Sequence, residues 1–242
     1  MTLSELSKRI CLTFILTMVS IPALTDGKDE TKVTVMFYHD PIRSYMNEQG
    51  HLVGASVDTA RTYLGSKSIA YEMELLPWAR LIRKSQSDHH TLISYLLRTK
   101  ERENQFHWLY KVAENTHHLV AKNSFDVSKF SLSRVRAGDY LAACEEKSGQ
   151  CEMLREIGFP NSNILELYDR TSGHMANLVL KGRVDFVAES LVEIAPELKK
   201  MHIDLDNFIE VYEISTLEGY IAAPITIDSQ ILKLLMAPAT VE

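Results

Sequence analysis

The 242-residue chain is poor in cysteine and has no long apolar run beyond its N-terminus. Three Cys are too few for a disulfide scaffold, and seven Pro and ten Gly without periodicity exclude collagen-like or low-complexity architecture. The formal net charge is −6 and the basic residues are scattered, so the basic stripe of a nucleic-acid-binding protein is lacking. With 45% hydrophobic and 24% charged residues, the composition is that of an ordinary globular protein of one large or two small domains.

Motifs of common catalytic and metal sites are lacking as well. The sequence has no Gly-x-Ser-x-Gly, no Cys-x-x-Cys, no calcium loop and no phosphate-binding loop. Two pairs of adjacent histidines, His89-His90 and His117-His118, do not chelate by themselves, because neighbours in a strand or helix point in different directions. We therefore expect no metal, no cofactor and no enzymatic activity.

The N-terminus is typical of a secretory signal peptide. Lys8 and Arg9 precede an apolar run over residues 10–24, after which the chain becomes polar. The run is shorter than the roughly 20 residues of a membrane-spanning helix. Cleavage is expected after Ala23 or Thr25, whereas a buried helix or a membrane anchor is the alternative interpretation.

Removal of residues 1–23 as a signal peptide takes away Cys11 and leaves Cys144 and Cys151. In an oxidising compartment outside the cytoplasm, an even number of cysteines favours a disulfide. A pair of free, buried thiols is the alternative.

Alternating strand and helix patterns fill the rest of the chain. Strands are predicted at 32–38, 69–76, 91–97, 117–122, 138–143, 163–167, 184–188 and 219–223, with 207–214 extended. Helices are predicted at 56–64 with Ser56 as cap, from Pro77, and at 151–158, 173–181, 190–201 and 227–235. This alternation indicates an α/β fold with mainly parallel sheets.

Four segments together resemble a known family. They are Gly50-His-Leu-Val-Gly-Ala-Ser-Val-Asp58, Pro77-Trp-Ala-Arg80, Arg98-Thr-Lys-Glu-Arg102 followed by Phe106-His-Trp108, and Leu180-Lys-Gly-Arg-Val-Asp185. In this order behind a signal peptide, they are similar to the extracellular solute-binding proteins of family 3, the periplasmic receptors of amino-acid ABC transporters. The resemblance covers roughly residues 32–236.

The resemblance implies a two-lobed periplasmic-binding-protein-like fold of type II, in which each lobe is a mainly parallel sheet flanked by helices. Lobe one is expected at 27–116 plus 219–242, lobe two at 122–213, and the hinges near 117–121 and 214–218. It further implies a monomer in the periplasm of a Gram-negative bacterium. The expected partners are a small ligand, an amino acid or related carboxylate, and a membrane permease or sensor.

In lobe one, the resemblance assigns the ligand α-carboxylate to Arg102. A guanidinium suits this role because it forms a bidentate, charge-assisted pair with a carboxylate. The alternative is a surface arginine paired with Glu101 or Glu103. Arg98, at the end of a predicted strand, is the second candidate.

Three more residues of lobe one are candidates for the ligand site. Tyr38 and Trp78 follow predicted strands, where a flat ring can pack on a ligand or on a cation, although large aromatic residues also often belong to the core. Arg80 lies two residues after Trp78, either in the cleft or on a solvated helix face.

In lobe two, Ser148 lies in the turn before a predicted helix, whose free N–H groups can face an anionic ligand. The amine-binding carboxylate of the family follows the Gly-Arg-Val-Asp strand, and Glu189 lies there. A carboxylate that faces Arg102 across a cleft suits a zwitterion.

The sequence departs from the family at two places that touch specificity. Ile42 follows Pro41 where an aromatic residue is usual, and Tyr95, Leu96 and Leu97 stand where the family is rich in serine. The ligand therefore stays open among amino acids, peptides and organic acids. A sensor or interaction protein of the same fold is the alternative function, followed by a dehydratase-like enzyme that uses Glu189.

Overall fold

The computed structural model describes residues 32–67, 69–168 and 172–238. The predicted signal peptide, residues 1–23, lies outside the described residues.

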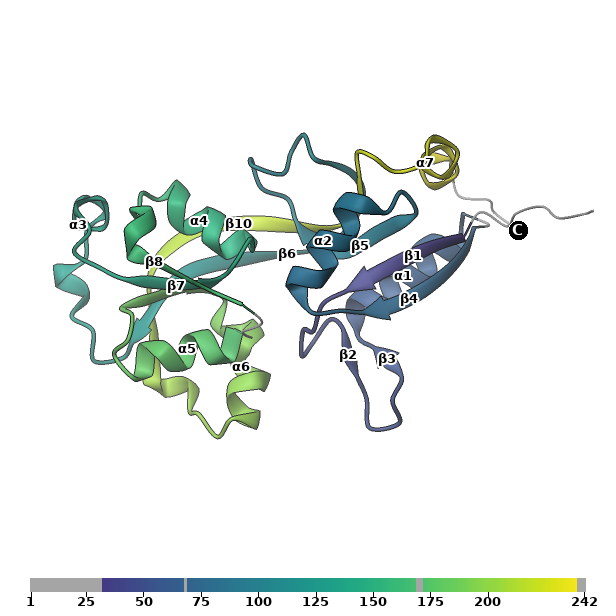
Figure 1. Ribbon diagram of the computed structural model, residues 1–242. Helices are drawn as coiled ribbons and strands as arrows, with labels where there is room; N and C mark the ends of the chain where they lie inside the picture. The colour runs from purple at the N-terminus through teal and green to yellow at the C-terminus, as the bar shows by residue number, and fades with distance from the viewer. Residues whose placement is uncertain (1–31, 68, 169–171, 239–242) are drawn as a thin grey trace, which may run out of the picture. The chain divides into compact units, whose positions relative to one another are not determined.

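One eight-stranded mixed sheet forms the frame, with strand order β4-β1-β5-β10-β6-β9-β7-β8 (Figure 1). Its strands are β1 (Lys32–Phe37), β4 (Ala70–Leu75), β5 (Thr91–Leu97), β6 (Phe106–Lys122), β7 (Ala142–Glu145), β8 (Ile164–Leu167), β9 (Phe186–Glu189) and β10 (Phe208–Pro224). A separate hairpin joins β2 (Tyr45–Met46) and β3 (Leu52–Val53). The α-helices are α1 (Ala55–Gly65), α2 (Trp78–Ser87), α3 (Leu132–Ala137), α4 (Gly149–Glu156), α5 (Ser172–Leu180), α6 (Leu191–Lys200) and α7 (Ser229–Met236). Short 3-10 helices lie at Val127–Lys129, Asn161–Asn163 and Leu205–Asn207.

Two parallel groups of strands make up this sheet. In the first, β1 pairs in parallel with β4 and β5; in the second, β7 pairs in parallel with β8 and β9. The long strands β6 and β10 pair antiparallel along their length and join the two groups. We call the first group with α1, α2 and α7 lobe one, and the second group with α3 to α6 lobe two. The predicted α/β class with mainly parallel strands is confirmed.

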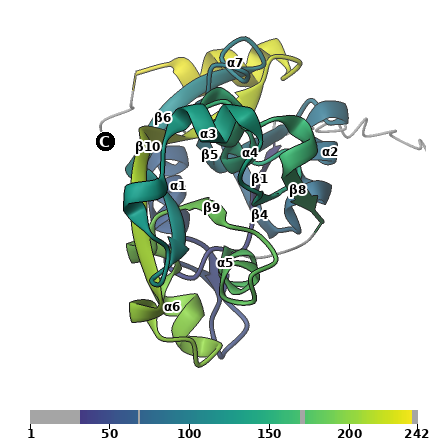
Figure 2. The ribbon, with the colours of Figure 1, turned by 90° about the vertical axis from the view of Figure 1, so that its left-hand side faces the viewer.

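Helices cover both faces of each group, and the alternation of side chains along the strands explains why. In β1, Val33, Val35 and Phe37 pack in the same core cluster as α1, whereas Met36 packs in the cluster of α2. In lobe two, one cluster includes residues of α3 and α4, and the other includes residues of α5 and α6. Figure 2 shows α3 and α4 on one side of the lobe-two strands and α5 and α6 on the other.

Most predicted elements are present, with three corrections. Gly54 is the N-cap of α1 and Ser56 lies buried in its first turn, so the predicted serine cap is wrong. The strand predicted at 138–143 is β7 at Ala142–Glu145. The two extended segments predicted at 207–214 and 219–223 are one strand, β10.

The hinges predicted near 117–121 and 214–218 fall inside β6 and β10. In β6, residues 118–120 also pair with β9 of lobe two. The position of the hinges and the limits of the lobes stay predictions.

A disulfide joins Cys144 at the end of β7 to Cys151 in α4, as predicted. The Cα–Cα distance is 5.3 Å, within the usual range. Ser148 lies between the two cysteines and caps α4, because its side chain accepts a hydrogen bond from the N–H of Cys151. The disulfide therefore fixes the first turn of α4 to the sheet.

Candidate functional site

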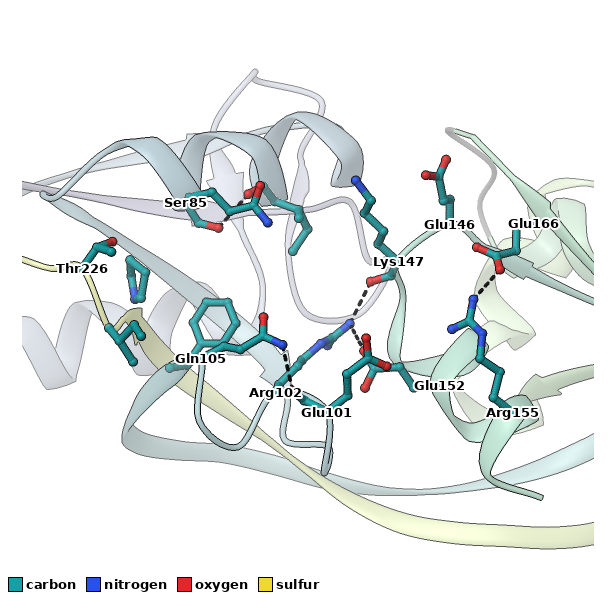
Figure 3. A pocket seen from close by; sticks show the side chains of 15 residues that line it. Ser85, Glu101, Arg102, Gln105, Glu146, Lys147, Glu152, Arg155, Glu166 and Thr226 are labelled. Atoms are coloured by element: carbon teal, nitrogen blue, oxygen red, sulfur yellow. Dashed lines mark hydrogen bonds and ion pairs between the residues drawn. The ribbon is translucent and has the colours of Figure 1, made fainter. Parts of the chain in front are cut away.

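Arg102 is the most deeply placed charged residue of the candidate site. It lies in the turn after β5 and is only 5% exposed. Its Nη1 donates a hydrogen bond to the carbonyl of Leu97, and its Nη2 donates one of 2.8 Å to the carbonyl of Lys147 in lobe two (Figure 3). The guanidinium also lies 5.5 Å from the ring centre of Trp78. The surface position considered as the alternative is therefore wrong.

The carboxylate that pairs with Arg102 comes from lobe two. Glu152, in the first turn of α4, places its Oε1 2.9 Å from Nη2 of Arg102. Its Oε2 is buried and has no hydrogen-bond partner among the described residues. Burial raises the pKa of Glu152, although Arg102 acts in the opposite direction. Burial also lowers the pKa of Arg102, yet a guanidinium stays protonated in proteins.

A cavity of about 670 Å³ opens beside this ion pair. Its walls come from α2, the turn at residues 101–106, the start of α4, and residues 224–226 (Figure 3). Arg102 and Glu152 both line it, and so does a second ion pair, Arg155 with Glu166. The volume lies in the range of small-molecule binding pockets, roughly 300–1,000 Å³.

Besides Arg102–Glu152, another ion pair connects the two lobes. Arg43, in the turn between β1 and β2, pairs with Asp40 of the same turn and with Glu193 in α6 of lobe two. Its guanidinium lies 4.3 Å from the ring centre of Tyr95. A small cavity of about 60 Å³ is lined by Asp40, Tyr95 and Glu193.

Tyr95 itself has an unusual backbone conformation, with φ of 63° in the middle of β5. Its ring lies against Gly219 of β10, where a Cβ atom would come within 2.1 Å of the ring. The side-chain amide of Asn115 in β6 hydrogen-bonds the Tyr95 hydroxyl. The ring thus fills the position that serine side chains would leave open.

The structure brings several predicted site residues together. Tyr38 and Trp78 pack edge to face with ring centres 5.3 Å apart, and Trp78 donates its Nε1–H to the carbonyl of Glu146 in lobe two. Burial and the nearby Asp40 raise the pKa of Tyr38. Glu189, at the end of β9, is buried and lines the small cavity together with Tyr38.

Three predicted residues lie elsewhere or serve another contact. Arg98 hydrogen-bonds Glu103 and lies over the ring of Trp108, outside both cavities described above. Arg80 is exposed on α2. Ser148 is buried and caps α4.

The sequence prediction missed Arg43, Glu152 and Glu193. An acidic residue in the first turn of a helix is common for helix stability alone, so Glu152 and Glu193 carried no distinct signal. Arg43 and Glu193 are 150 positions apart, and only the fold brings them together. Among the residues that the structure describes, no group of three or more His, Cys, Asp or Glu could hold a metal ion.

Comparison of sequences gives no match, either to a protein-family profile or to a curated protein. Comparison of structures gives many. The sensor domain of a histidine kinase with similarity to periplasmic binding proteins matches with a TM-score of 0.70 at 16% identity, over 86% of this chain and 89% of that one. The arginine-, lysine-, histidine-binding protein ArtJ from Geobacillus stearothermophilus matches with 0.65 at 19% identity, over 85% and 86%. Holo ArgBP from T. maritima matches with 0.65 at 15% identity, over 86% and 89%.

At these identities the likeness shows the fold alone. In the described part of the chain, no helix is long and apolar enough to cross a membrane. The neighbours are consistent with the resemblance to solute-binding proteins of family 3, and this chain has the two-lobed fold of the periplasmic binding proteins.

Proposed function

We propose that this protein is a periplasmic solute-binding protein that captures a small carboxylate-bearing molecule, such as an amino acid, between its lobes. The observation that carries the proposal is the buried guanidinium of Arg102, which holds a carboxylate at the junction of the lobes. When the ligand binds, its carboxylate is proposed to replace the Glu152 carboxylate as the partner of Arg102.

The surroundings of Arg102 support such an exchange. The cavity of about 670 Å³ reaches the ion pair, so a solute can approach without passing through the core. The ring of Trp78 lies 5.5 Å from the guanidinium of Arg102, close enough for a cation–π contact. Because Oε2 of Glu152 lacks a hydrogen-bond partner, Glu152 satisfies the site less well than a ligand that pairs with both oxygens.

Lobe two supplies the second half of the proposed site. Glu189 lies buried at the end of β9 and lines the small cavity, not the larger one beside Arg102; in the proposed closed form its carboxylate holds the amine of a zwitterion. Closure of lobe two over the ligand then presents a form that a membrane permease distinguishes from the open one. The amino-acid-binding proteins among the structural neighbours agree with this role, and a monomer suffices for it.

A sensory role is the second candidate. Arg43–Glu193 and Arg102–Glu152 join the lobes through side chains of the protein itself. A histidine kinase sensor domain has the same fold. In this role the protein surface, rather than a transported ligand, transmits the signal.

Isothermal titration calorimetry tests the first candidate after a thermal-shift screen of amino acids, short peptides and organic acids. Any ligand that binds only the folded state raises its melting temperature. We expect a free amino acid to bind and its carboxamide, which lacks the carboxylate, to bind at least about tenfold more weakly.

Two variants and one control make the test specific for Arg102. Arg102→Lys keeps a positive charge beside Glu152 but loses the planar fork, so ligand affinity should fall by about 10–100-fold. Glu152→Gln removes the competing charge and should raise the affinity. Arg61→Lys, an exposed arginine of α1, is the matched control and should bind like the wild type. Equal binding of acid and carboxamide, or no binding across the whole panel, would reject capture through Arg102.

A further inference from the structure

Hydrogen bonds and the close approach of a glycine hold the backbone around Arg43 in place, and the Arg43 side chain points into the interior of the protein. The carboxylate of Asp40 accepts hydrogen bonds from the N–H groups of Ile42 at 2.9 Å and Arg43 at 2.7 Å. The carbonyl of Arg43 accepts one from Ser56 in α1. Gly54 has φ of 127° and no room for a Cβ, which would lie 2.3 Å from the Arg43 carbonyl oxygen. This turn therefore presents Arg43 in one direction.

The guanidinium of Arg43 is recognised as a ligand guanidinium would be. Its Nη1 lies 3.1 Å from Oδ2 of Asp40, its Nη2 donates to Glu193, and its face lies on the ring of Tyr95. Two carboxylates at the edge and an aromatic ring on the face satisfy both kinds of interaction that a guanidinium makes. Asp40 and Tyr95 belong to lobe one, whereas Glu193 belongs to lobe two.

The space beside this group is acidic. Among the described residues, the small cavity of about 60 Å³ is lined by four carboxylates, those of Asp40, Glu189, Glu193 and Glu197, by His39, and by no lysine or arginine. His117 lines it too but adds no charge near neutral pH, since burial lowers its pKa to about 4. Arg43 pairs with one carboxylate from each lobe here, and without it Asp40 and Glu193 would lose this compensating charge.

We propose that Arg43 is a built-in cationic ligand, whose guanidinium occupies a site made by both lobes and holds them together. The inference goes beyond the proposed function, because it concerns a group of the chain itself and does not require Arg102 to bind anything. It also assigns the chemistry of the site: once Arg43 is removed, Asp40, Tyr95 and Glu193 form a site for a small guanidinium or amine cation.

Trp78 provides a reporter of lobe separation. Its Nε1–H bonds the carbonyl of Glu146 in lobe two, and its side chain is 7% exposed. The chain has two tryptophans, so the Trp108→Phe background leaves Trp78 as the single source of tryptophan fluorescence. Separation of the lobes exposes this indole to water and shifts its emission to longer wavelength.

In this background, Arg43→Ala should shift the Trp78 emission to longer wavelength and increase its quenching by acrylamide. Methylguanidinium chloride at millimolar concentration should reverse both changes, whereas sodium chloride of equal ionic strength should not. In the double variant Arg43→Ala with Glu193→Gln, methylguanidinium should have no effect. Arg61→Ala, which removes an exposed arginine paired with Asp58, is the control and should leave the emission unchanged.

Glu193→Gln alone keeps the inference testable if Arg43→Ala does not fold, because it leaves the β1–β2 turn intact and weakens the same contact from lobe two. It should also shift the emission to longer wavelength. Wild-type emission in both Arg43→Ala and Glu193→Gln would overturn the inference. So would a shift in Arg43→Ala that methylguanidinium and sodium chloride reverse equally.

Discussion

Replacing Arg102 by methionine should destabilise the protein far more than replacing an exposed arginine. The change removes the cation that pairs with Glu152 and leaves a carboxylate that is 12% exposed. Breaking a buried ion pair from one side costs about 3–5 kcal/mol, because the remaining charge is uncompensated. The carbonyls of Leu97 and Lys147 also lose a donor, at roughly 1 kcal/mol each. We expect a total loss of about 5–7 kcal/mol in the free energy of unfolding.

A second substitution separates the charge from the packing. Glu152→Leu in the Arg102→Met background removes the stranded carboxylate, and apolar replacement of a whole buried pair is often neutral. The double variant should therefore regain about 2 kcal/mol relative to Arg102→Met. Urea denaturation, followed by fluorescence and far-ultraviolet circular dichroism together, gives both values from the transition midpoints.

The pH dependence supplies an independent check. Burial raises the pKa of Glu152, and loss of Arg102 takes away the charge that opposes this rise. An acid with a raised pKa in the folded state stabilises the fold as the pH falls through that pKa, since protonation removes the buried charge. The penalty of Arg102→Met should thus shrink as the pH falls from neutral toward the ordinary pKa of glutamate, about 4.3. A penalty below about 1 kcal/mol, or a double variant no more stable than the single one, would refute the reasoning.

Two further predictions concern His117 and the disulfide. Burial lowers the pKa of His117 to about 4, so the unfolded chain takes up a proton below about pH 6.5 before the folded one does. The wild type should lose up to about 3 kcal/mol of its free energy of unfolding between pH 6.5 and 4 through this group. Urea denaturation of His117→Gln should show a correspondingly weaker dependence of this free energy on pH. An NMR titration that gives His117 an ordinary pKa would contradict this. Replacing Cys144 and Cys151 by alanine should cost about 2–3 kcal/mol, as expected for the loop closed over a separation of seven residues. Equal melting of the wild type and this variant would show that the disulfide adds no stability.

The sequence predicted the order of strands and helices because the buried elements carry strong local patterns. All seven residues of β5 are buried, and the run 91–97 is predicted with its correct bounds. The first part of β6, residues 106–116, and the middle of β10, residues 215–218, were not predicted as strands for the opposite reason. Residues 106–116 of β6 are exposed or half-buried, so they lack a clear apolar alternation and pair only because β10 lies beside them.

The candidate site was predictable only where a local motif marked it. Arg102 lies in the segment Arg98-Thr-Lys-Glu-Arg102, and Cys144 and Cys151 are the two cysteines beyond the predicted signal peptide. The partners of these motifs depend on long-range contacts: Glu152 meets Arg102 only when α4 is placed against lobe one, and Glu193 meets Arg43 across 150 positions. Local patterns in a single sequence do not show which residues far apart along the chain will pair.

The place of β10 in the sheet has a consequence for how the chain acquires its structure during synthesis. Its residues 219–222 pair with β5, so lobe one is complete only after the chain has been made as far as residue 222. Strands β6 to β9, by contrast, come from one continuous stretch, residues 106–189, and can associate earlier. Until β10 arrives, the buried strand β5 has an open edge, which is prone to pairing with other chains. Truncation before Gly219 is therefore expected to produce aggregation rather than a smaller folded protein.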